Sequence, residues 1–372
     1  MNNRIVTQLI LQATPFCNMR CTYCYLPERN KSSKLNHSQL RRLLEYLVSE
    51  KLIGTYFNVA WHLGEPLAAG IKWLDESISI IKEVLSDNVK IQFNIQTNGT
   101  LINDNWCKFL SQNKISVGVS LDGPMLQNDI SRVNRLGGGT YLTVIKGINH
   151  LQKHSIDFHV ISVLTPAIIE DPESYIDFLD EVGITKVAFN VPSIKGSCNN
   201  PMPMMNERIY ADKLRKFLSF IFFYTIRNPG RLRIREFELF GGAAQDVENW
   251  QDAAQIPLRL LSVDYRGNIF TFSPELSSLS DDLKSRYVIG HVSEDSCILD
   301  FNAVDKISSE VNSGIKRCHS QCTYFKVCGG GSVSSKVSEN GTADSSETLF
   351  CRIGVQLFSN VLIKNLLNVP SD

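Results

Sequence analysis

Three cysteines lie close together near the N-terminus, in the stretch TPFCNMRCTYCYLPE at residues 14–28. They are Cys17, Cys21 and Cys24, with the spacing C-x3-C-x2-C and no fourth cysteine beside them. Three thiolates hold three irons of a [4Fe–4S] cluster and leave the fourth iron open, whereas a structural zinc or a ferredoxin cluster takes four protein ligands. The incomplete set therefore predicts a metal centre at which a substrate or cofactor binds.

A second group of cysteines lies near the other end of the chain. Cys318, Cys322 and Cys328 have the spacing C-x3-C-x5-C, and Cys351 follows them. Four thiols close a metal off from substrate, and such a set in isolation is more typical of a zinc ribbon than of an iron–sulfur cluster. Lone cysteines are most often small buried apolar residues, and three stand alone here: Cys107, Cys198 and Cys297.

Composition narrows the class of protein. The chain has 372 residues, 43% of them hydrophobic, with 38 basic and 38 acidic side chains. This balance, without a basic or acidic block, predicts no nucleic-acid partner and no membrane surface. The N-terminus lacks the order of a signal peptide, and the longest apolar run, at 217–226, suits a buried helix better than a membrane span. We therefore expect a cytoplasmic protein, whose reduced cysteines serve metal binding or catalysis.

The pattern of apolar residues predicts an α/β fold. Strand-like runs alternate with segments whose apolar residues recur every three or four positions, which favours a parallel sheet with helices outside it, as in a partial barrel. The strand-like runs are residues 4–12, 55–61, 89–96, 115–121, 157–164 and 186–191. The helical segments are residues 38–50, 71–85, 103–113, 140–154 and 172–183.

Unusual polar motifs follow the first four strands. The cysteine triplet comes after the first, HLGEP at 62–66 after the second, TNGT at 97–100 after the third and LDGP at 121–124 after the fourth. The loops at the carboxyl ends of parallel barrel strands share one rim, so these motifs should converge. Asn-Gly and Asp-Gly alone are ordinary turn dipeptides; their order behind the triplet indicates a shared site.

The triplet, with Tyr23 before its last cysteine, resembles the signature of the radical S-adenosylmethionine (radical SAM) enzymes. The resemblance implies a partial (β/α)6 TIM-like barrel. It also implies that the open iron takes the amino and carboxylate groups of S-adenosylmethionine (SAM). An electron from a donor such as flavodoxin or ferredoxin then gives a 5'-deoxyadenosyl radical.

Further motifs are similar to those of the same family. HLGEP looks like its glycine-glutamate-proline segment, in which backbone groups of Gly64 and the side chain of Glu65 would hold the methionine amino group, although Leu63 stands where many relatives have glycine. QTNGT and SLDGP look like the third- and fourth-strand motifs. The resemblance places Asn98 and Ser120 at the ribose or carboxylate of the cofactor.

Four further residues lie in or beside these motifs. Arg132, in ISRVNRLGGGT, matches the carboxylate-pairing arginine of the family and is preferred to Arg135. Trp61 and His62 stand at a strand end, where packing residues are common, and are left out of the site.

The C-terminal cysteines resemble the SPASM extension of peptide-modifying radical SAM enzymes, which carries auxiliary [4Fe–4S] clusters. Many such extensions hold two clusters, but Phe272 and Ser332 occupy positions where the other set needs cysteine. We therefore expect one auxiliary cluster and one radical SAM cluster. The resemblance divides the chain into a barrel, a bridging region and a SPASM-like or twitch-like domain, at residues 1–195, 196–255 and 256–372.

Four segments together look most like maturases that build three-residue cyclophanes in ribosomal peptides, including the glycine-rich-repeat and Xenorhabdus/Yersinia groups. The segments are GNIFTFSPEL, CGGGSVSSK, RLRIREFE and HVISVLT. The resemblance implies a precursor peptide with aromatic-x-x motifs. A ring carbon would join the β-carbon of the residue two positions later, and the auxiliary cluster would accept the surplus electron.

The ring proton needs a base, for which Glu275 and Asp122 are the candidates, although Glu275 could simply cap a helix and Asp122 could simply set its turn. Where the leader peptide binds is open. The segment KGSCNNPMPMMNER is a candidate, and an ordinary linker is an equal reading.

Other functions remain open from sequence. A related maturase could form a thioether or oxidise a serine or cysteine of a sulfatase to formylglycine. Outside the enzymes, the alternatives are a zinc-binding module and an iron–sulfur electron carrier. Neither of these explains why Glu65, Asn98 and Ser120 occur in this order after strands.

Overall fold

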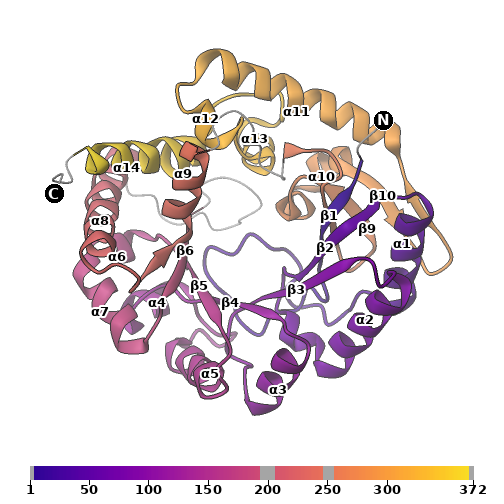
Figure 1. The fold of residues 1–372 in the computed structure, drawn as a ribbon, viewed down its shortest axis with the longest axis horizontal. Coiled ribbons are helices and arrows are strands. Elements are labelled where there is room, and N and C mark those ends of the chain that lie inside the picture. Colours follow the sequence, from indigo (N-terminus) through magenta and orange to yellow (C-terminus); the bar gives the residue numbers. More distant parts are fainter. Residues whose placement is uncertain (1–3, 193–205, 246–254, 368–372) are drawn as a thin grey trace.

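A computed structural model describes residues 4–192, 206–245 and 255–367 of the chain. All six predicted strands are present and pair in parallel, each with the next along the chain. They form the curved inner layer of Figure 1. Their bounds are β1 (Val6–Leu11), β2 (Ile53–Trp61), β3 (Lys90–Thr97), β4 (Ser116–Ser120), β5 (Phe158–Val163) and β6 (Lys186–Asn190). The predicted partial barrel is confirmed.

The predicted helices cover the outer face of this sheet (Figure 1). Helix α1 shows why they form: Asn36 and Gln39 make a capping box at its start, and its leucines at positions 40, 43, 44 and 47 are buried. The apolar run at 217–226 lies within α8, as expected for a buried helix. The main outer helices are α1 (His37–Ser49), α2 (Ile71–Val84), α3 (Asp104–Gln112), α5 (Tyr141–Lys153), α7 (Pro172–Val182) and α8 (Glu207–Arg227).

Short helices that the sequence did not predict follow several strands at the carboxyl rim. They lengthen the connections of otherwise regular βα units. They are the 3₁₀-helix η1 (Pro66–Ala69) after β2, α4 (Met125–Ser131) after β4, and α6 (Pro166–Ile169) after β5.

The sheet continues across the expected boundary at residue 256. Strand β8 (Leu260–Val263) pairs in parallel with β1, and β9, β10 and β11 extend the sheet from it in antiparallel fashion. At the other end β7 (Arg233–Ile234) pairs with β6. The result is one sheet of eleven strands among the described residues, in the order β11-β10-β9-β8-β1-β2-β3-β4-β5-β6-β7. The added antiparallel strands are β9 (Asn268–Thr271), β10 (Val288–Val292) and β11 (Cys297–Leu299).

The residues expected to bridge two domains therefore belong partly to the barrel. Helix α8 packs against α7 and α14, and β7 lengthens the sheet. Cys198 and most of the segment KGSCNNPMPMMNER lie outside the described residues.

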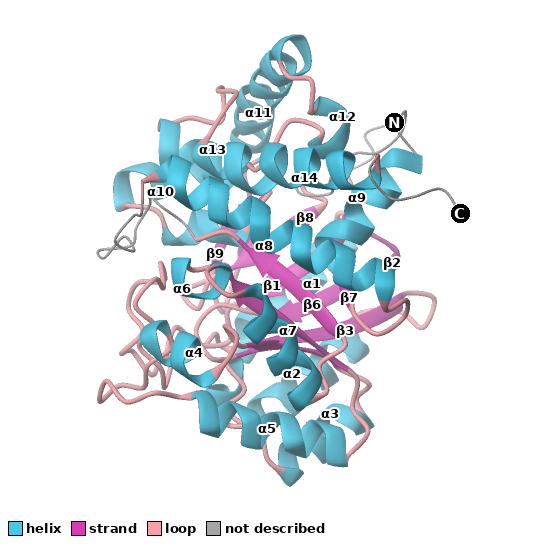
Figure 2. Cartoon of the chain, turned by 90° about the vertical axis from the view of Figure 1, so that its left-hand side faces the viewer, coloured by secondary structure: helices cyan, strands magenta, loops and turns pink. Residues whose placement is uncertain are grey.

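The C-terminal helices close the open side of the barrel, between β1 and β6 (Figure 1). From the side they lie at the top of the molecule, opposite α3 and α5 (Figure 2). In the described part of the chain, no helix is long and apolar enough to cross a membrane. These C-terminal elements are α11 (Phe301–Gln321), α12 (Phe325–Cys328), α13 (Val333–Asn340), a π-helical turn η4 (Cys351–Leu357) and α14 (Phe358–Leu366).

The position of the loop after β3 depends on a close approach to α5. A Cβ atom added at Gly147 of α5 would lie 2.2 Å from the carbonyl oxygen of Gly99. We predict that Gly147→Ala lowers the free energy of unfolding by about 1–3 kcal/mol, because helix and loop must separate. Urea denaturation measures this change.

Gly241 in α9 (Arg235–Gln245) is the matched control, because a Cβ there meets nothing within 4 Å. Gly241→Ala should leave stability unchanged or raise it by about 0.5–1 kcal/mol, the helix preference of alanine over glycine. Equal losses in the two variants would show that the approach of α5 to the loop does not matter.

Candidate active site at the barrel rim

The first cysteine group lies on the loop after β1, with all three thiols free and partly exposed. Cys21 and Cys24 are close enough to Cys17 for their charges to raise its pKa. The N–H of Met19 donates to Cys17 Sγ at 3.4 Å, and Asn98 Nδ2 at 3.7 Å. Across the described residues, no three cysteine, histidine or carboxylate groups converge as a preformed metal site. The triplet is therefore assigned to metal by its chemistry.

The surroundings of the three thiols favour the binding of a metal cation to their sulfur atoms. Burial raises the pKa of Cys17 to about 12 and that of Cys21 to about 11. The guanidinium groups of Arg132 and Arg29 act in the opposite direction on Cys21. Because a thiolate is the metal ligand, these thiols need the charge of bound iron to ionise. N–H donors and cations around sulfur fit an iron–sulfur cluster.

The HLGEP loop packs directly against the cysteine loop. The N–H of Glu65 donates to the carbonyl of Phe16 at 2.8 Å. Gly64 has φ +70°, and a Cβ there would lie 2.2 Å from the carbonyl oxygen of Thr14, so glycine is required. Leu63 also has φ +70°, a left-handed conformation that costs a leucine about 1 kcal/mol or more. A glycine at position 63 would adopt this conformation without that cost.

The side chain of Glu65 does not face the open site, contrary to expectation. It is fully buried, and its Oε1 accepts from the N–H of Leu67 (2.9 Å) and the hydroxyl of Thr97 (2.7 Å). Its Oε2 accepts from the N–H of Asn98 at 2.7 Å. Both oxygens are therefore used by the protein. The carboxylate joins the loops after β2 and β3, and these three donors use three of its acceptor positions.

Asn98 and Ser120 lie at the same rim. Asn98 donates to Asn18 Oδ1 at 2.8 Å and accepts from the N–H and hydroxyl of Thr100, so it ties the loop after β3 to the cysteine loop. Ser120, at the end of β4, accepts from Gln96 Nε2 at 3.0 Å and stays partly exposed. Ser120 is the more accessible of the two for a ribose or carboxylate.

Asp122 is unsuitable as a base, which corrects one of the two candidates. Its side chain is fully buried and forms an ion pair with Arg132 Nη2 at 2.9 Å. It also accepts from the N–H of Val163 (2.9 Å) and the hydroxyl of Tyr23 (2.5 Å). A carboxylate with these three neighbours and no exposure cannot meet a substrate proton. Its role is to anchor Tyr23 of the cysteine loop.

Arg132 is bound to Asp122 and stacks over the ring of Tyr23, 5.5 Å from its centroid. Its Nε is buried and has no hydrogen-bond partner among the described residues. This atom is a donor of Arg132 that a ligand carboxylate could use.

Arg135 binds to the outer side of the cysteine loop, away from the inner site at which Arg132 lies. It donates to the carbonyls of Cys17 (3.1 Å) and Arg29 (3.3 Å) and to Asn30 Oδ1 (2.6 Å). Its guanidinium lies over the ring of Phe16. These contacts support the preference for Arg132 over Arg135 at the inner site.

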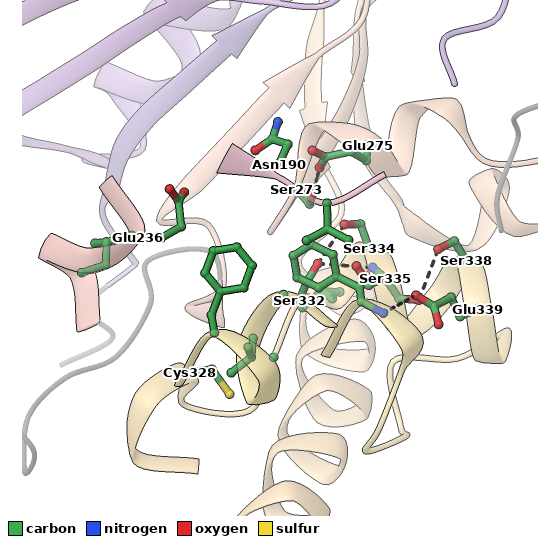
Figure 3. Close-up of a pocket in the computed structure, with 18 of the residues that line it drawn as sticks. Asn190, Glu236, Ser273, Glu275, Cys328, Ser332, Ser334, Ser335, Ser338 and Glu339 are labelled. Carbon is green, nitrogen blue, oxygen red and sulfur yellow. Dashed lines mark hydrogen bonds between the residues drawn. The ribbon is translucent and has the colours of Figure 1, made fainter. Parts of the chain in front are cut away.

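A cavity of about 760 Å³ lies between the barrel rim and the C-terminal helices. Tyr23 and Tyr25 of the cysteine loop line it, as do Asn190 at the end of β6 and Cys328 of the second cysteine group. In Figure 3, Asn190 and Glu275 lie on the barrel side and Cys328 on the opposite side. One wall carries hydroxyl groups from the start and body of α13: Ser332, Ser334, Ser335 and Ser338.

Two of the three glutamates that line the cavity are fully engaged by the protein. Glu236 pairs with Arg235 and accepts from the N–H of Phe189 at 2.9 Å. Glu339 accepts from the N–H groups of Leu349 (2.5 Å) and the next residue (3.2 Å). Neither carboxylate is free to take a proton from a ligand without losing these contacts.

Glu275 is the third, and a serine hydroxyl is the hydrogen-bond partner of its carboxylate among the described residues. It lies in the 3₁₀-helix η3 (Pro274–Ser278), half-buried, with the hydroxyl of Ser273 beside it. Burial raises the pKa of Tyr25, and the charge of Glu275 raises it further. Burial lowers the pKa of His62, and Glu275 opposes this. Sequence reasoning set His62 aside and did not name Tyr25, because nothing local shows that they face Glu275.

The cysteines of the second group lie near enough to one another for their charges to interact, without converging as a preformed site among the described residues. Cys318 lies on α11, Cys322 just after it, Cys328 on α12 and Cys351 at the start of the π-helical turn. Burial raises the pKa of Cys351 to about 11, and the charges of Cys328 and Cys322 contribute. Neighbouring thiols that resist ionisation alone are suited to a shared metal.

Polar hydrogens surround this second group as well. The buried amine of Lys336 donates to Cys318 Sγ at 3.5 Å, and Gln356 Nε2 donates to Cys351 Sγ at 3.7 Å. A buried cation on sulfur fits a thiolate ligand of an anionic cluster. Phe272 is fully buried, so it fills core where a second set would need a thiol.

The sequence was compared with protein families and with known proteins and structures. The profile of the radical SAM superfamily matches residues 11–216. The chain belongs to the radical SAM superfamily. Membership implies a [4Fe–4S] cluster and SAM, and the cysteine triplet with its N–H donors and cations suits that cluster.

Known relatives of this radical SAM protein differ in how much of it they cover. An uncharacterized protein of Synechocystis is 32% identical over 95% of this chain and 90% of its own. The serine-type anaerobic sulfatase-maturating enzyme of Klebsiella aerogenes is 29% identical over 47% of this chain and 44% of its own. The cysteine-type enzyme of Clostridium perfringens is 32% identical over 42% and 44%. The match thus spans under half the length of these two enzymes.

Solved structures share the fold over nearly the whole chain. The structure of anSMEcpe with bound AdoMet and Cp18Cys peptide superposes with a TM-score of 0.76 and 21% identity, covering 97% of this chain and 98% of that one. Streptococcus suis SuiB bound to precursor peptide SuiA gives 0.66 and 17%, covering 93% and 76%. The C-terminal extension is therefore part of the shared fold.

The buried carboxyl of Glu65 gives a test of the rim. Burial raises its pKa to about 7, above the ordinary value near 4.3. Its deprotonation therefore costs more in the folded protein, and stability should fall as the pH rises from about 5 to about 8, by roughly 2–3 kcal/mol. Glu65→Gln should abolish this slope. It should also cost about 1–3 kcal/mol at low pH, because its amide faces a hydrogen-bond donor.

Urea denaturation of iron-free protein under anaerobic conditions, between pH 5 and pH 8 (roughly the titration range), measures both effects. Glu50→Gln, at an exposed position after α1, is the control and should keep the slope of the original protein. A Glu65→Gln variant with an unchanged slope would mean that another group titrates.

Proposed function

We propose that this radical SAM enzyme crosslinks a ribosomally made precursor peptide. The bond joins an aromatic ring carbon to the β-carbon of the residue two positions later. The observation that carries the proposal is the cavity, which touches the loop of the first cysteine group and Cys328 of the second. A substrate in it would lie between the centre that begins a radical reaction and one that can end it by accepting an electron.

The lining of the cavity suits an extended peptide. Hydroxyl groups along α13 can bind backbone amides, and apolar side chains on the facing walls can hold a ring: Leu239, Phe240, Val327, Phe350 and Phe358. The structures of anSMEcpe and SuiB, which share this fold, include complexes with peptides. Peptide binding in this chain is an inference from the lining and from that likeness.

The radical SAM centre, when bound, supplies a 5'-deoxyadenosyl radical that takes one hydrogen atom. This chain contributes the anchoring of the cysteine loop, the backbone of Gly64, the hydroxyl of Ser120 and the free Nε of Arg132 for the cofactor. Cys318, Cys322, Cys328 and Cys351 would hold an auxiliary cluster, which takes the surplus electron.

Glu275 is the proposed base. Of the three carboxylates that line the cavity, it is the one that no cation or backbone N–H holds among the described residues, and its charge acts on Tyr25 of the cysteine loop. When the β-carbon bonds to the ring, the ring carbon must lose its hydrogen as a proton, and Glu275 can accept it. The peptide then loses two hydrogens in all, one as an atom and one as a proton with its electron passed on.

The second cysteine group has a complete set of four thiols, and this favours a carbon–carbon bond over a thioether. With four protein thiols on the auxiliary metal, no position remains for a substrate thiolate. A bond between a ring carbon and a β-carbon forms without any substrate atom bound to that metal.

Formylglycine formation on a sulfatase serine or cysteine is the second candidate. It is favoured by the alignment of the barrel with serine-type and cysteine-type sulfatase-maturating enzymes. Phe272 in place of a second auxiliary ligand set weighs against it. A zinc module or a plain electron carrier leaves the rim motifs unexplained.

Metal content tests the two cysteine groups. Protein reconstituted with iron and sulfide should hold about eight irons per chain, and replacement of all three triplet cysteines by alanine should leave about four. Iron analysis and absorbance near 400 nm measure this. About twelve irons would reveal a further cluster, and zinc in the purified protein would remove the auxiliary assignment.

The product tests the chemistry. A synthetic peptide with an aromatic-x-x motif should lose the mass of two hydrogens, and deuterium on the β-carbon should appear in 5'-deoxyadenosine. Glu275→Gln should still form 5'-deoxyadenosine but lower crosslinking about 100-fold or more, because the base is lost.

Glu236→Gln is the matched control, since that side chain lines the same cavity but is held by Arg235. It should retain most of the crosslinking activity. Deuterium arriving only from an α-carbon would rule out the cyclophane product. A sulfatase-derived peptide with a central serine or cysteine tests the second candidate. If the enzyme forms an aldehyde on this peptide, which hydroxylamine traps, formylglycine formation is the function instead of crosslinking.

A further inference from the structure

Large apolar side chains project into solvent beside the cysteine loop. Leu136 is 97% exposed, Leu126 76%, Leu142 72% and Ile130 63%. They come from α4, the hairpin at residues 133–139 and the start of α5, and α4 packs against α5. Exposed apolar groups gathered on adjoining segments are a common sign of an interaction surface.

The hairpin that carries Leu136 is held in one conformation. Val133 and Gly139 form an antiparallel bridge that closes its base. The side chain of Asn134 accepts from the N–H groups of Leu136 (2.8 Å) and Gly138 (3.0 Å). The backbone N–H of Asn134 also donates to the carbonyl of Gly138 at 2.8 Å. The leucine is thus presented by an ordered tip, so a partner would bind it at little entropic cost.

This hairpin is bonded directly to the cysteine loop. Met19 bridges Asn134, and the N–H of Arg20 donates to the carbonyl of Val133 at 2.8 Å. Arg135, next to the exposed leucine, donates to the carbonyl of Cys17. A protein bound to the hairpin would therefore touch the loop that holds the cluster.

The same face carries uncompensated positive charge. Arg20, Arg29 and Arg135 form no ion pair with any acid among the described residues, and Arg20 and Arg135 are exposed. Of the acids close by, Glu28 pairs with a lysine and with an arginine from after β8, and Asp129 accepts from backbone N–H groups at the start of α5. Asp129 keeps its negative charge, so among the described residues three arginines against one unpaired acid leave the face with net positive charge. The face is apolar and cationic.

We propose that α4, the 133–139 hairpin and Arg20 form the docking surface for a small acidic one-electron carrier protein of the flavodoxin or ferredoxin class. The cluster on the triplet gains one electron from outside, and the carrier is oxidised by one electron. An acidic carrier complements the arginines, which steer its approach, and a small apolar centre suits a transient redox encounter. The inference depends on membership of the radical SAM superfamily and not on the identity of the product.

Two variants test the surface with an acidic plant-type [2Fe–2S] ferredoxin as the probe. Leu136→Asp and Arg20→Glu should each raise the dissociation constant for oxidised ferredoxin about tenfold at low salt, measured by calorimetry with the iron-loaded enzyme. Formation of 5'-deoxyadenosine driven by reduced ferredoxin should fall by about the same factor. Formation driven by dithionite, which needs no docking, should stay within about twofold.

Ile298→Asp on β11 and Lys306→Glu on α11 are the matched controls. Ile298 is 64% exposed and Lys306 is exposed, and both are on elements remote from the cysteine loop in sequence. Neither should change ferredoxin binding. In the original protein, binding should weaken as salt is added.

Three outcomes would overturn the proposal. The first is unchanged ferredoxin affinity in both variants. The second is an equal fall of the dithionite-driven rate, which would place the residues in cluster support. The third is loss of peptide modification with both rates of SAM cleavage intact, which would make the surface a peptide site. Leu136→Ser removes the apolar side chain without adding a charge, so it separates the loss of apolar contact from the charge that Leu136→Asp introduces. It should also weaken ferredoxin binding.

Discussion

The rim of this protein depends on one buried carboxylate. Glu65 receives hydrogen bonds from Leu67, Thr97 and Asn98, while its own N–H donates to Phe16 of the cysteine loop. Three loops from three strands are thereby fixed relative to one another. A carboxylate in such a position costs free energy to bury. The hydrogen bonds from these three donors offset part of that cost.

A second buried acid completes the arrangement from the other side. Asp122 anchors Tyr23 and Arg132, so the cysteine loop is held at its middle as well as at its start. Together the two carboxylates give the loop a defined course before any metal is present. The thiols themselves stay protonated there, because burial opposes their ionisation. Metal binding is thus coupled to loss of protons from a loop that is already positioned.

The fold and the place of the site could be predicted from the sequence, because they follow from local patterns. Alternating strand and helix periodicity fixes a parallel sheet, and parallel strands put the motifs of residues 62–66, 97–100 and 121–124 on one rim. What each carboxylate does could not be predicted. Glu65 and Asp122 look like exposed motif residues, and only the folded chain shows that their oxygens are already occupied. The pairing of β8 with β1 was missed because it joins residues about 250 positions apart.

That pairing has a mechanical consequence. Because β8 continues the sheet from β1, the C-terminal half cannot rotate away from the barrel without breaking a ladder of backbone hydrogen bonds. The span between the two cysteine groups is therefore set by the main chain and does not adjust to the ligand. A fixed distance between the two cysteine groups limits the length of a ligand that can reach both. Under the function proposed above, it would select a peptide by how many residues fit between the two cysteine groups, more than by the identity of any one side chain.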